Sequence, residues 1–182
     1  MVSTPRKYVA FLRAINVGGR VVKMDALRSL FQAIPLGGVE TFIASGNVVF
    51  HSAAADIGVL ERRIEKKLSE ALGYEVDTYV RSTAELARVA LQRPFGVVEP
   101  AHNLLVGFLG SEPTEAAREA VAALRTPVDE FVIDGRELYW LCRGRQSDTQ
   151  VTGPRLARAL GMETTVRKMN TIERLVAKYP DE

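Results

Sequence analysis

The sequence predicts an α+β protein made of two ferredoxin-like halves in tandem, each a βαββαβ unit followed by an extra helix. Strand-like and helix-like stretches follow the order β-α-β-β-α-β-α twice along the 182 residues. The hairpin glycines Gly46 and Gly135 stand 89 residues apart, and Arg81 and Arg167, which end the fourth strands, stand 86 apart. Residue identity between the halves is negligible, so the prediction is a duplicated topology, and its alternative is two unrelated halves that share one arrangement.

Each element of the first half has its own signal. Apolar residues recur every three or four positions in the helices, and Pro35 and Gly73 stop two of them. Gly46-Asn47 between two β-rich runs predicts a hairpin, and Ser82 with Glu85 predicts a capping box. The predicted strands are Tyr8–Ile15, Val39–Ser45, Val48–His51 and Glu75–Arg81, and the predicted helices are Met24–Ile34, Asp56–Leu72 and Ser82–Gln92.

The same order returns after a linker at residues 95–102. Asp134-Gly135 between two β-rich runs predicts a type I′ hairpin. The predicted strands are Leu104–Leu109, Glu130–Ile133, Glu137–Arg143 and Glu163–Lys168, and the predicted helices are Thr114–Leu124, Gly153–Leu160 and Thr171–Lys178. The sequence therefore predicts two domains, residues 1–94 and 103–182.

The composition excludes several classes of protein. Hydrophobic residues make up 47% and charged residues 25%, as in an ordinary globular chain. The single Cys142 excludes a disulfide framework, and only two histidines are present, so we expect no metal site and no cofactor. Because residues 1–7 contain no apolar stretch, we expect no secretory signal, and because no apolar run is long enough, we expect no membrane span. We expect a reduced, cytoplasmic location.

Charge is distributed unevenly along the chain. Residues 1–33 carry a net charge of +5, residues 34–142 carry −6, residues 143–180 carry +5 and residues 181–182 carry −2, so the whole chain sums to only +2. If the two basic segments meet in the fold, they form a positive surface that attracts anions. The alternative is dispersed charge that serves solubility.

The predicted topology places two loops together. A right-handed crossover makes the first and second strands run the same way, so Asn16–Arg20 should lie beside Ser45–Asn47. In the second half, Gly110-Ser111 should lie beside Asp134-Gly135. The two strand-ending arginines should lie at the opposite edges of their sheets.

These loops suggest an anion site. Gly18 and Gly19 can turn backbone N–H groups outward, and Arg13, Arg20 and Lys23 are close in sequence, which is typical of a phosphate or carboxylate cradle. The alternative is a tight turn that needs two glycines, and Ser45-Gly46-Asn47 has the same ambiguity. The candidate ligand-binding residues are Arg13, Asn16, Gly18, Gly19, Arg20, Ser45, Asn47, Arg81, Asn170 and Thr171.

No catalytic motif is present, so a binding protein is favoured over an enzyme. Cys142 shares a strand face with Leu138 and Trp140, which predicts a buried thiol. His51 and His102 have no recognisable partner, and the strand aromatics predict a packed sheet face. Glu61 and Glu65 stand four residues apart on the predicted helix, and basic residues recur at the same spacing, so we expect a solvated helix face.

The leading hypothesis is a module that binds a small anionic or phosphate-containing ligand. The second is a nucleic-acid binder that uses the basic C-terminal segment. The third is an enzyme for a small anionic substrate, in which Ser45, Arg81, Asn170 and Thr171 converge. The fourth is a scaffold whose edge strands pair between subunits. The sequence predicts no membrane partner and no particular oligomeric state.

Several motifs resemble one known family. Leu12-Arg-Ala-Ile-Asn-Val-Gly-Gly19 and Thr41-Phe-Ile-Ala-Ser-Gly-Asn-Val-Val-Phe50 are similar to stretches of the family catalogued as domain of unknown function 1697, and Gly135-Arg-Glu-Leu-Tyr139 and Asn170-Thr171 follow in order. The resemblance implies an α+β fold of this length and no established activity. Three positions depart from the family pattern: Ala14 replaces a usual glycine, Met169 replaces an aromatic residue, and Thr152–Arg155 replaces a stretch similar to Ser-Lys-Leu-Thr.

Overall fold

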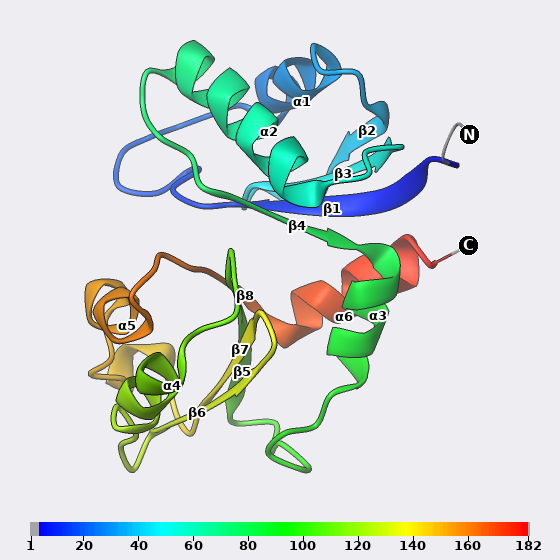
Figure 1. The fold of residues 1–182 in the computed structure, drawn as a ribbon. Coiled ribbons are helices and arrows are strands. Elements are labelled where there is room, and N and C mark those ends of the chain that lie inside the picture. Colours follow the sequence, from blue (N-terminus) through cyan, green and yellow to red (C-terminus); the bar gives the residue numbers. More distant parts are fainter. Residues whose placement is uncertain (1–3, 182) are drawn as a thin grey trace. The chain divides into compact units, whose positions relative to one another are not determined.

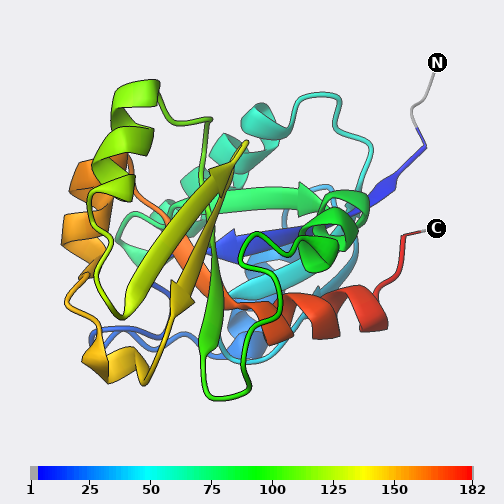
Figure 2. The ribbon, with the colours of Figure 1, turned by 90° about the horizontal axis from the view of Figure 1, so that it is seen from below.

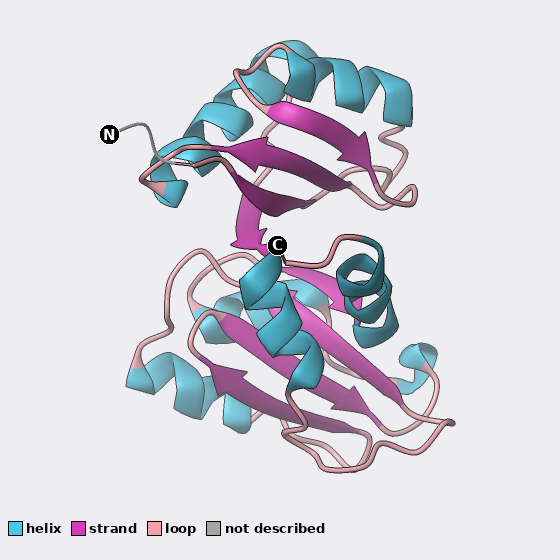
Figure 3. Ribbon diagram, turned by 90° about the vertical axis from the view of Figure 1, so that its right-hand side faces the viewer, coloured by secondary structure: helices cyan, strands magenta, loops and turns pink. Residues whose placement is uncertain are grey.

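A computed structural model describes residues 4–181, and Figure 3 shows its helices and strands. Contacts divide these residues into two compact units: unit 1 comprises residues 4–87 and 178–181, and unit 2 comprises residues 88–177. Each unit holds one four-stranded sheet with the strand order of a ferredoxin-like βαββαβ fold. The predicted fold class is therefore confirmed, whereas the domain boundaries at residues 94 and 103 stay a prediction.

The sheet of unit 1 has the strand order β2-β3-β1-β4, and every neighbouring pair is antiparallel. Helices α1 and α2 cover one face of it (Figure 1), and the core lies between them and the sheet. The elements are β1 (Arg6–Leu12), α1 (Met24–Gln32), β2 (Gly37–Thr41), β3 (Asn47–Ser52), α2 (Ile57–Leu72) and β4 (Thr78–Ser82). Helix α3 (Thr83–Leu91) follows and crosses into unit 2.

The local sequence signals of two helices in unit 1 are confirmed by the structure. The predicted stripe of α2 is buried at Leu60, Ile64 and Leu68, because these residues recur once per helical turn and face the sheet. The capping box is present as well: the Ser82 amide donates to the Glu85 carboxylate over 2.7 Å, and the Glu85 amide donates to Ser82 Oγ over 3.2 Å.

Two glutamates of α2 correct the prediction of a merely solvated helix face. Glu61 Oε1 accepts a hydrogen bond from the Val80 amide over 2.7 Å, and Glu65 Oε1 accepts one from the Thr78 amide over 3.0 Å. Strand β4 is the outer strand of its sheet, so these two amides have no neighbouring strand to bond. The carboxylates therefore supply the partners that the sheet lacks at this edge.

The sheet of unit 2 has the order β6-β7-β5-β8, again all antiparallel. Helices α4 and α5 lie side by side on one face (Figures 1 and 2) and enclose the second core. The elements are β5 (Asn103–Phe108), α4 (Glu115–Ala122), β6 (Asp129–Asp134), β7 (Glu137–Cys142), the 3-10 turn η1 (Gln146–Asp148), α5 (Gly153–Leu160) and β8 (Thr165–Lys168). Helix α6 (Met169–Lys178) then ends in unit 1.

Both hairpins differ from their predictions in detail. Strand β3 already begins at Asn47, so residues 42–46 form the first loop, which is longer than a Gly-Asn turn. In the second hairpin Asp134 pairs with Glu137, so Gly135 and Arg136 are the two turn residues. Only Gly135 of these two has a positive φ, at 57°, which is the pattern of a type II′ turn rather than type I′.

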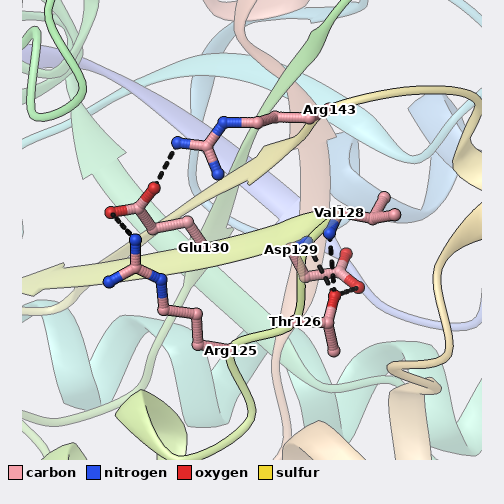
Figure 4. A network of polar contacts seen from close by, with 6 residues as sticks. All are labelled: Arg125, Thr126, Val128, Asp129, Glu130 and Arg143. Atoms are coloured by element: carbon pink, nitrogen blue, oxygen red, sulfur yellow. Dashed lines mark hydrogen bonds and ion pairs between the residues drawn. The ribbon is translucent and has the colours of Figure 1, made fainter.

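A polar network holds the start of β6 (Figure 4). Asp129 has no exposed surface, and its two carboxylate oxygens accept hydrogen bonds from Trp140 Nε1 over 2.8 Å and from Thr126 Oγ1 over 2.9 Å. Next to it, Glu130 accepts a short hydrogen bond from Arg143, which lowers the pKa of the Glu130 carboxyl. The network thereby joins β6, β7 and the turn before β6.

Candidate functional site

The two loops of unit 1 meet as the topology predicts. The Asn16 side-chain amide donates to the carbonyl of Ala44 over 3.2 Å, and the Leu12 amide donates to the carbonyl of Gly46 over 2.8 Å. The end of β1 and the β2–β3 loop therefore lie at one edge of the sheet. The equivalent pair in unit 2 is joined in the same way, since the Leu109 amide donates to the Arg136 carbonyl over 3.0 Å.

Several side chains predicted to bind a ligand bond instead to the protein itself. Asn16 Oδ1 accepts from the Val22 amide over 2.7 Å. Asn47 has no exposed surface, and its Nδ2 donates to the Phe42 carbonyl over 3.1 Å and to Ser45 Oγ over 2.8 Å. These groups therefore shape the loops.

The cations of this loop have partners of their own. Arg13 Nη1 lies 3.2 Å from a carboxylate oxygen of Asp77. The Arg20 guanidinium carbon lies 4.3 Å from the centre of the Tyr74 ring, which is a cation–π contact. Gly18 and Gly19 are exposed at φ +62° and +82°, with no atom within 4 Å of where a Cβ would stand. The loop is thus open at its glycines and largely paired at its arginines.

At Ala14, which departs from the family pattern, the backbone shows why glycine is usual. Its φ is +62°, in the left-handed region where a Cβ crowds the following carbonyl. The glycine usual at this position adopts such a φ without that cost.

We expect Ala14→Gly to stabilise unit 1 by about 0.5–1 kcal/mol, since it removes about 1–2 kcal/mol of strain and adds some unfolded-state entropy. Urea unfolding followed by circular dichroism measures the change. Ala53→Gly is the control: Ala53 is exposed in a loop and its φ is not positive, so this variant should be slightly less stable. An equal loss in both variants would show that Ala14 carries no strain.

Arg81 and Arg167 occupy matching places, each one residue before the end of its strand, and Arg81 is buried whereas Arg167 is half-buried. Arg81 is only 1% exposed, and its Nη1 donates to the Val80 carbonyl over 2.9 Å. Arg167 Nη1 donates to the Val166 carbonyl over 3.0 Å, and burial lowers the pKa of its guanidinium to about 10. Arg81 lies opposite Val9 of β1, and Arg167 lies opposite Val106 of β5. The shared geometry favours a structural role for both.

Unit 2 contains a groove of about 760 Å³ that the sequence did not reveal. One wall is formed by residues between 93 and 104, the segment that joins α3 to β5 (Figure 1). The opposite wall is formed by Lys168, Met169, Asn170 and Glu173, where β8 passes into α6. An ion pair joins the walls, since Arg93 Nη2 lies 3.8 Å from Glu173 Oε1. Pockets of about 300–1,000 Å³ are typical of sites for small ligands.

Asn170 and Thr171 behave differently although they are neighbours. Asn170 is exposed and lines the groove, whereas Thr171 is 8% exposed and does not line it. His102 also lines the groove, with its Nε2 3.9 Å from a carboxylate oxygen of Glu99. The sequence gives His102 no recognisable partner; in the structure a turn through Pro100, closed by a hydrogen bond from the His102 amide to the Glu99 carbonyl over 2.9 Å, brings the two residues together.

Other predicted features are confirmed as parts of the core. Cys142 is fully buried, and burial raises the pKa of its thiol, so it lacks the accessible, electropositive setting of a nucleophile. The aromatic residues predicted on strands are buried too, namely Phe42, Phe50, Phe108, Tyr139 and Trp140, although Phe42 lies just after the end of β2. Among residues 4–181 no three His, Cys, Asp or Glu side chains gather closely enough to hold a metal ion. In the same range no helix has the length and apolar character to span a bilayer.

Comparison with known proteins supports the fold and the family. No curated protein matches this chain. The solved structure of the conserved bacterial protein SP0830 from Streptococcus pneumoniae is similar, with a TM-score of 0.73 over 96% of this chain and 98% of that one, at 18% sequence identity. At that identity the likeness concerns the fold alone. Residues 6–139 match the family described as Protein of unknown function (DUF1697), which is most of the chain and includes the Leu12–Gly19 and Thr41–Phe50 motifs. The chain therefore belongs to the DUF1697 family.

Proposed function

We propose that this protein binds a small anionic ligand in the groove of unit 2. The observation that carries the proposal is a concave site of about 760 Å³ whose lining includes both Lys168 and the exposed Asn170. A cation and an amide donor in the lining of one pocket are a common means of orienting an anionic group. Asn170 is also one of the candidate ligand-binding residues predicted from the sequence.

The charges around the groove support this choice. The Arg93 guanidinium donates to the carbonyls of Ala90 and Gln92 over 2.7 and 2.8 Å and faces Glu173. Within unit 2, among its described residues, no carboxylate forms an ion pair with Lys168. Lys168 is thus a lining cation that forms no ion pair with a described carboxylate of unit 2.

Anion binding by the Asn16–Arg20 loop stays a prediction, and so does nucleic-acid binding by a joint basic surface. The loop has fewer available groups than the groove, because Asn16 and Asn47 bond internally and Arg13 pairs with Asp77. One experiment separates the loop from the groove.

Two-dimensional NMR of the full chain, titrated with acetate and with inorganic phosphate, tests the proposal. We expect shifts of the amides around Lys168 and Asn170, and at least tenfold weaker binding in Lys168→Gln, which loses the charge that attracts the anion. Arg158→Gln is the matched control, because Arg158 is exposed on α5 outside the groove and its loss changes the net charge equally.

An Arg20→Gln variant completes the set. If anion-induced shifts were confined to residues 16–23 and lost in Arg20→Gln but kept in Lys168→Gln, the binding site would be the loop and the groove proposal would be wrong. Equal weakening in Lys168→Gln and Arg158→Gln would also overturn it, since that result indicates general charge attraction.

A further inference from the structure

The groove of unit 2 is as much apolar as it is charged. Val97, Val98, Pro100, Leu104 and Met169 all line it. Val97 is 98% exposed, which is the largest exposure of any large hydrophobic side chain in the described residues. A ligand with an apolar body would remove this surface from water, and each buried Å² contributes about 25 cal/mol.

The charge balance limits how much negative charge a ligand can bring. Two acidic residues, Glu99 and Glu173, line the same groove as Lys168. Glu173 is only partly balanced by Arg93, at 3.8 Å, and Glu99 faces His102 at 3.9 Å, which is a charged pair only when the imidazole is protonated. A doubly charged phosphate would approach these carboxylates at a cost, whereas a single negative charge is balanced by Lys168.

From these two observations we infer that the ligand of the groove is a monocarboxylic acid with an apolar body, aromatic or branched, rather than a phosphate ester or nucleotide. This inference rests on the proposed function. The carboxylate lies against Lys168 and the Asn170 amide, and the body covers Val97 and Met169. A carboxylate suits Lys168 because a charge-assisted hydrogen bond from an ammonium group is stronger than one between neutral groups.

Isothermal titration calorimetry of the full chain tests the ligand class with four probes: 3-phenylpropionate, its neutral amide 3-phenylpropanamide, acetate and adenosine monophosphate. We expect 3-phenylpropionate to bind at least tenfold more tightly than each of the others. The amide lacks the charge, acetate lacks the apolar body, and the nucleotide carries a second charge.

Two variants locate the contacts. Lys168→Gln should weaken the binding of 3-phenylpropionate at least tenfold, so that its affinity comes close to that of the neutral amide. Val97→Asn should weaken 3-phenylpropionate several-fold and leave acetate unchanged, and this side chain is too exposed for its substitution to disturb folding. Arg158→Gln should bind every probe as the wild type does.

The outcomes separate the two proposals. If adenosine monophosphate or acetate binds as tightly as 3-phenylpropionate and depends on Lys168, the groove binds anions but the inferred ligand class is wrong. If 3-phenylpropionate and its amide bind equally, or Val97→Asn changes nothing, the class is also overturned. If no probe depends on Lys168, the proposed function fails and the inference fails with it.

Discussion

Replacing Asp129 by alanine should destabilise unit 2 by about 3 kcal/mol. The substitution leaves the indole N–H of Trp140 and the hydroxyl of Thr126 without the carboxylate that they bond at 2.8 and 2.9 Å. Asp129 has no exposed surface, so water cannot readily replace it. A buried donor left without an acceptor costs about 1–3 kcal/mol, and relief from burying a charge offsets only part of two such losses.

Urea unfolding followed by circular dichroism measures the loss, and hydrogen exchange shows whether it is confined to residues 88–177. Asp129→Asn keeps one acceptor oxygen and should lose less than half as much. In a double-mutant cycle with Trp140→Phe, a coupling of at least about 1 kcal/mol is expected, because the two side chains share one bond. Additive losses in that cycle would show that the indole does not depend on Asp129.

Replacing Gly46 by alanine should destabilise unit 1 by about 2–3 kcal/mol. Gly46 has φ +72°, and a Cβ there would stand 3.1 Å from Ile15 Cβ and 3.2 Å from Leu12 Cβ. The variant therefore combines left-handed strain of about 1–2 kcal/mol with a clash against side-chain atoms attached directly to the neighbouring backbone. It should also separate the two loops, since the Gly46 carbonyl accepts from the Leu12 amide.

Gly18→Ala is the matched control, because Gly18 has a similar φ of +62° and open space around it. It should lose only the strain, about 1 kcal/mol. Urea unfolding compares the two variants, and faster exchange of the Leu12 amide in Gly46→Ala alone would show the loss of contact between loops. Equal destabilisation by both substitutions would rule out the close approach as the cause.

The helices and the topology were accessible from sequence because their signals are local. Leu60, Ile64 and Leu68 recur once per turn, and one buried stripe is enough to predict α2. The meeting of Asn16 with the β2–β3 loop followed from the topology alone, since the crossover rule decides which strand ends share an edge.

Features that depend on contacts between distant segments were not accessible. The groove arises where residues 93–104 meet the start of α6. Arg93 and Glu173, which form an ion pair there, are too far apart in the sequence for any periodic pattern to predict their contact. The return of the chain end to unit 1 was missed for the same reason: Tyr179 donates to the Glu40 carboxylate over 2.7 Å, far along the sequence. Lys168 ends a strand, and nothing in its neighbours marks it as lining a pocket.

The bonds from α2 to β4 also bear on how unit 1 meets other chains. An outer strand offers its free amides to any extended segment and so invites strand addition. At β4 the amides of Thr78 and Val80 are already taken by Glu65 and Glu61, so an incoming strand would have to displace two carboxylates. Four helical residues rise about 6 Å and two strand residues about 6.6 Å. Because these two distances match, two glutamates one turn apart on α2 can bond two successive outward-facing amides of the edge strand.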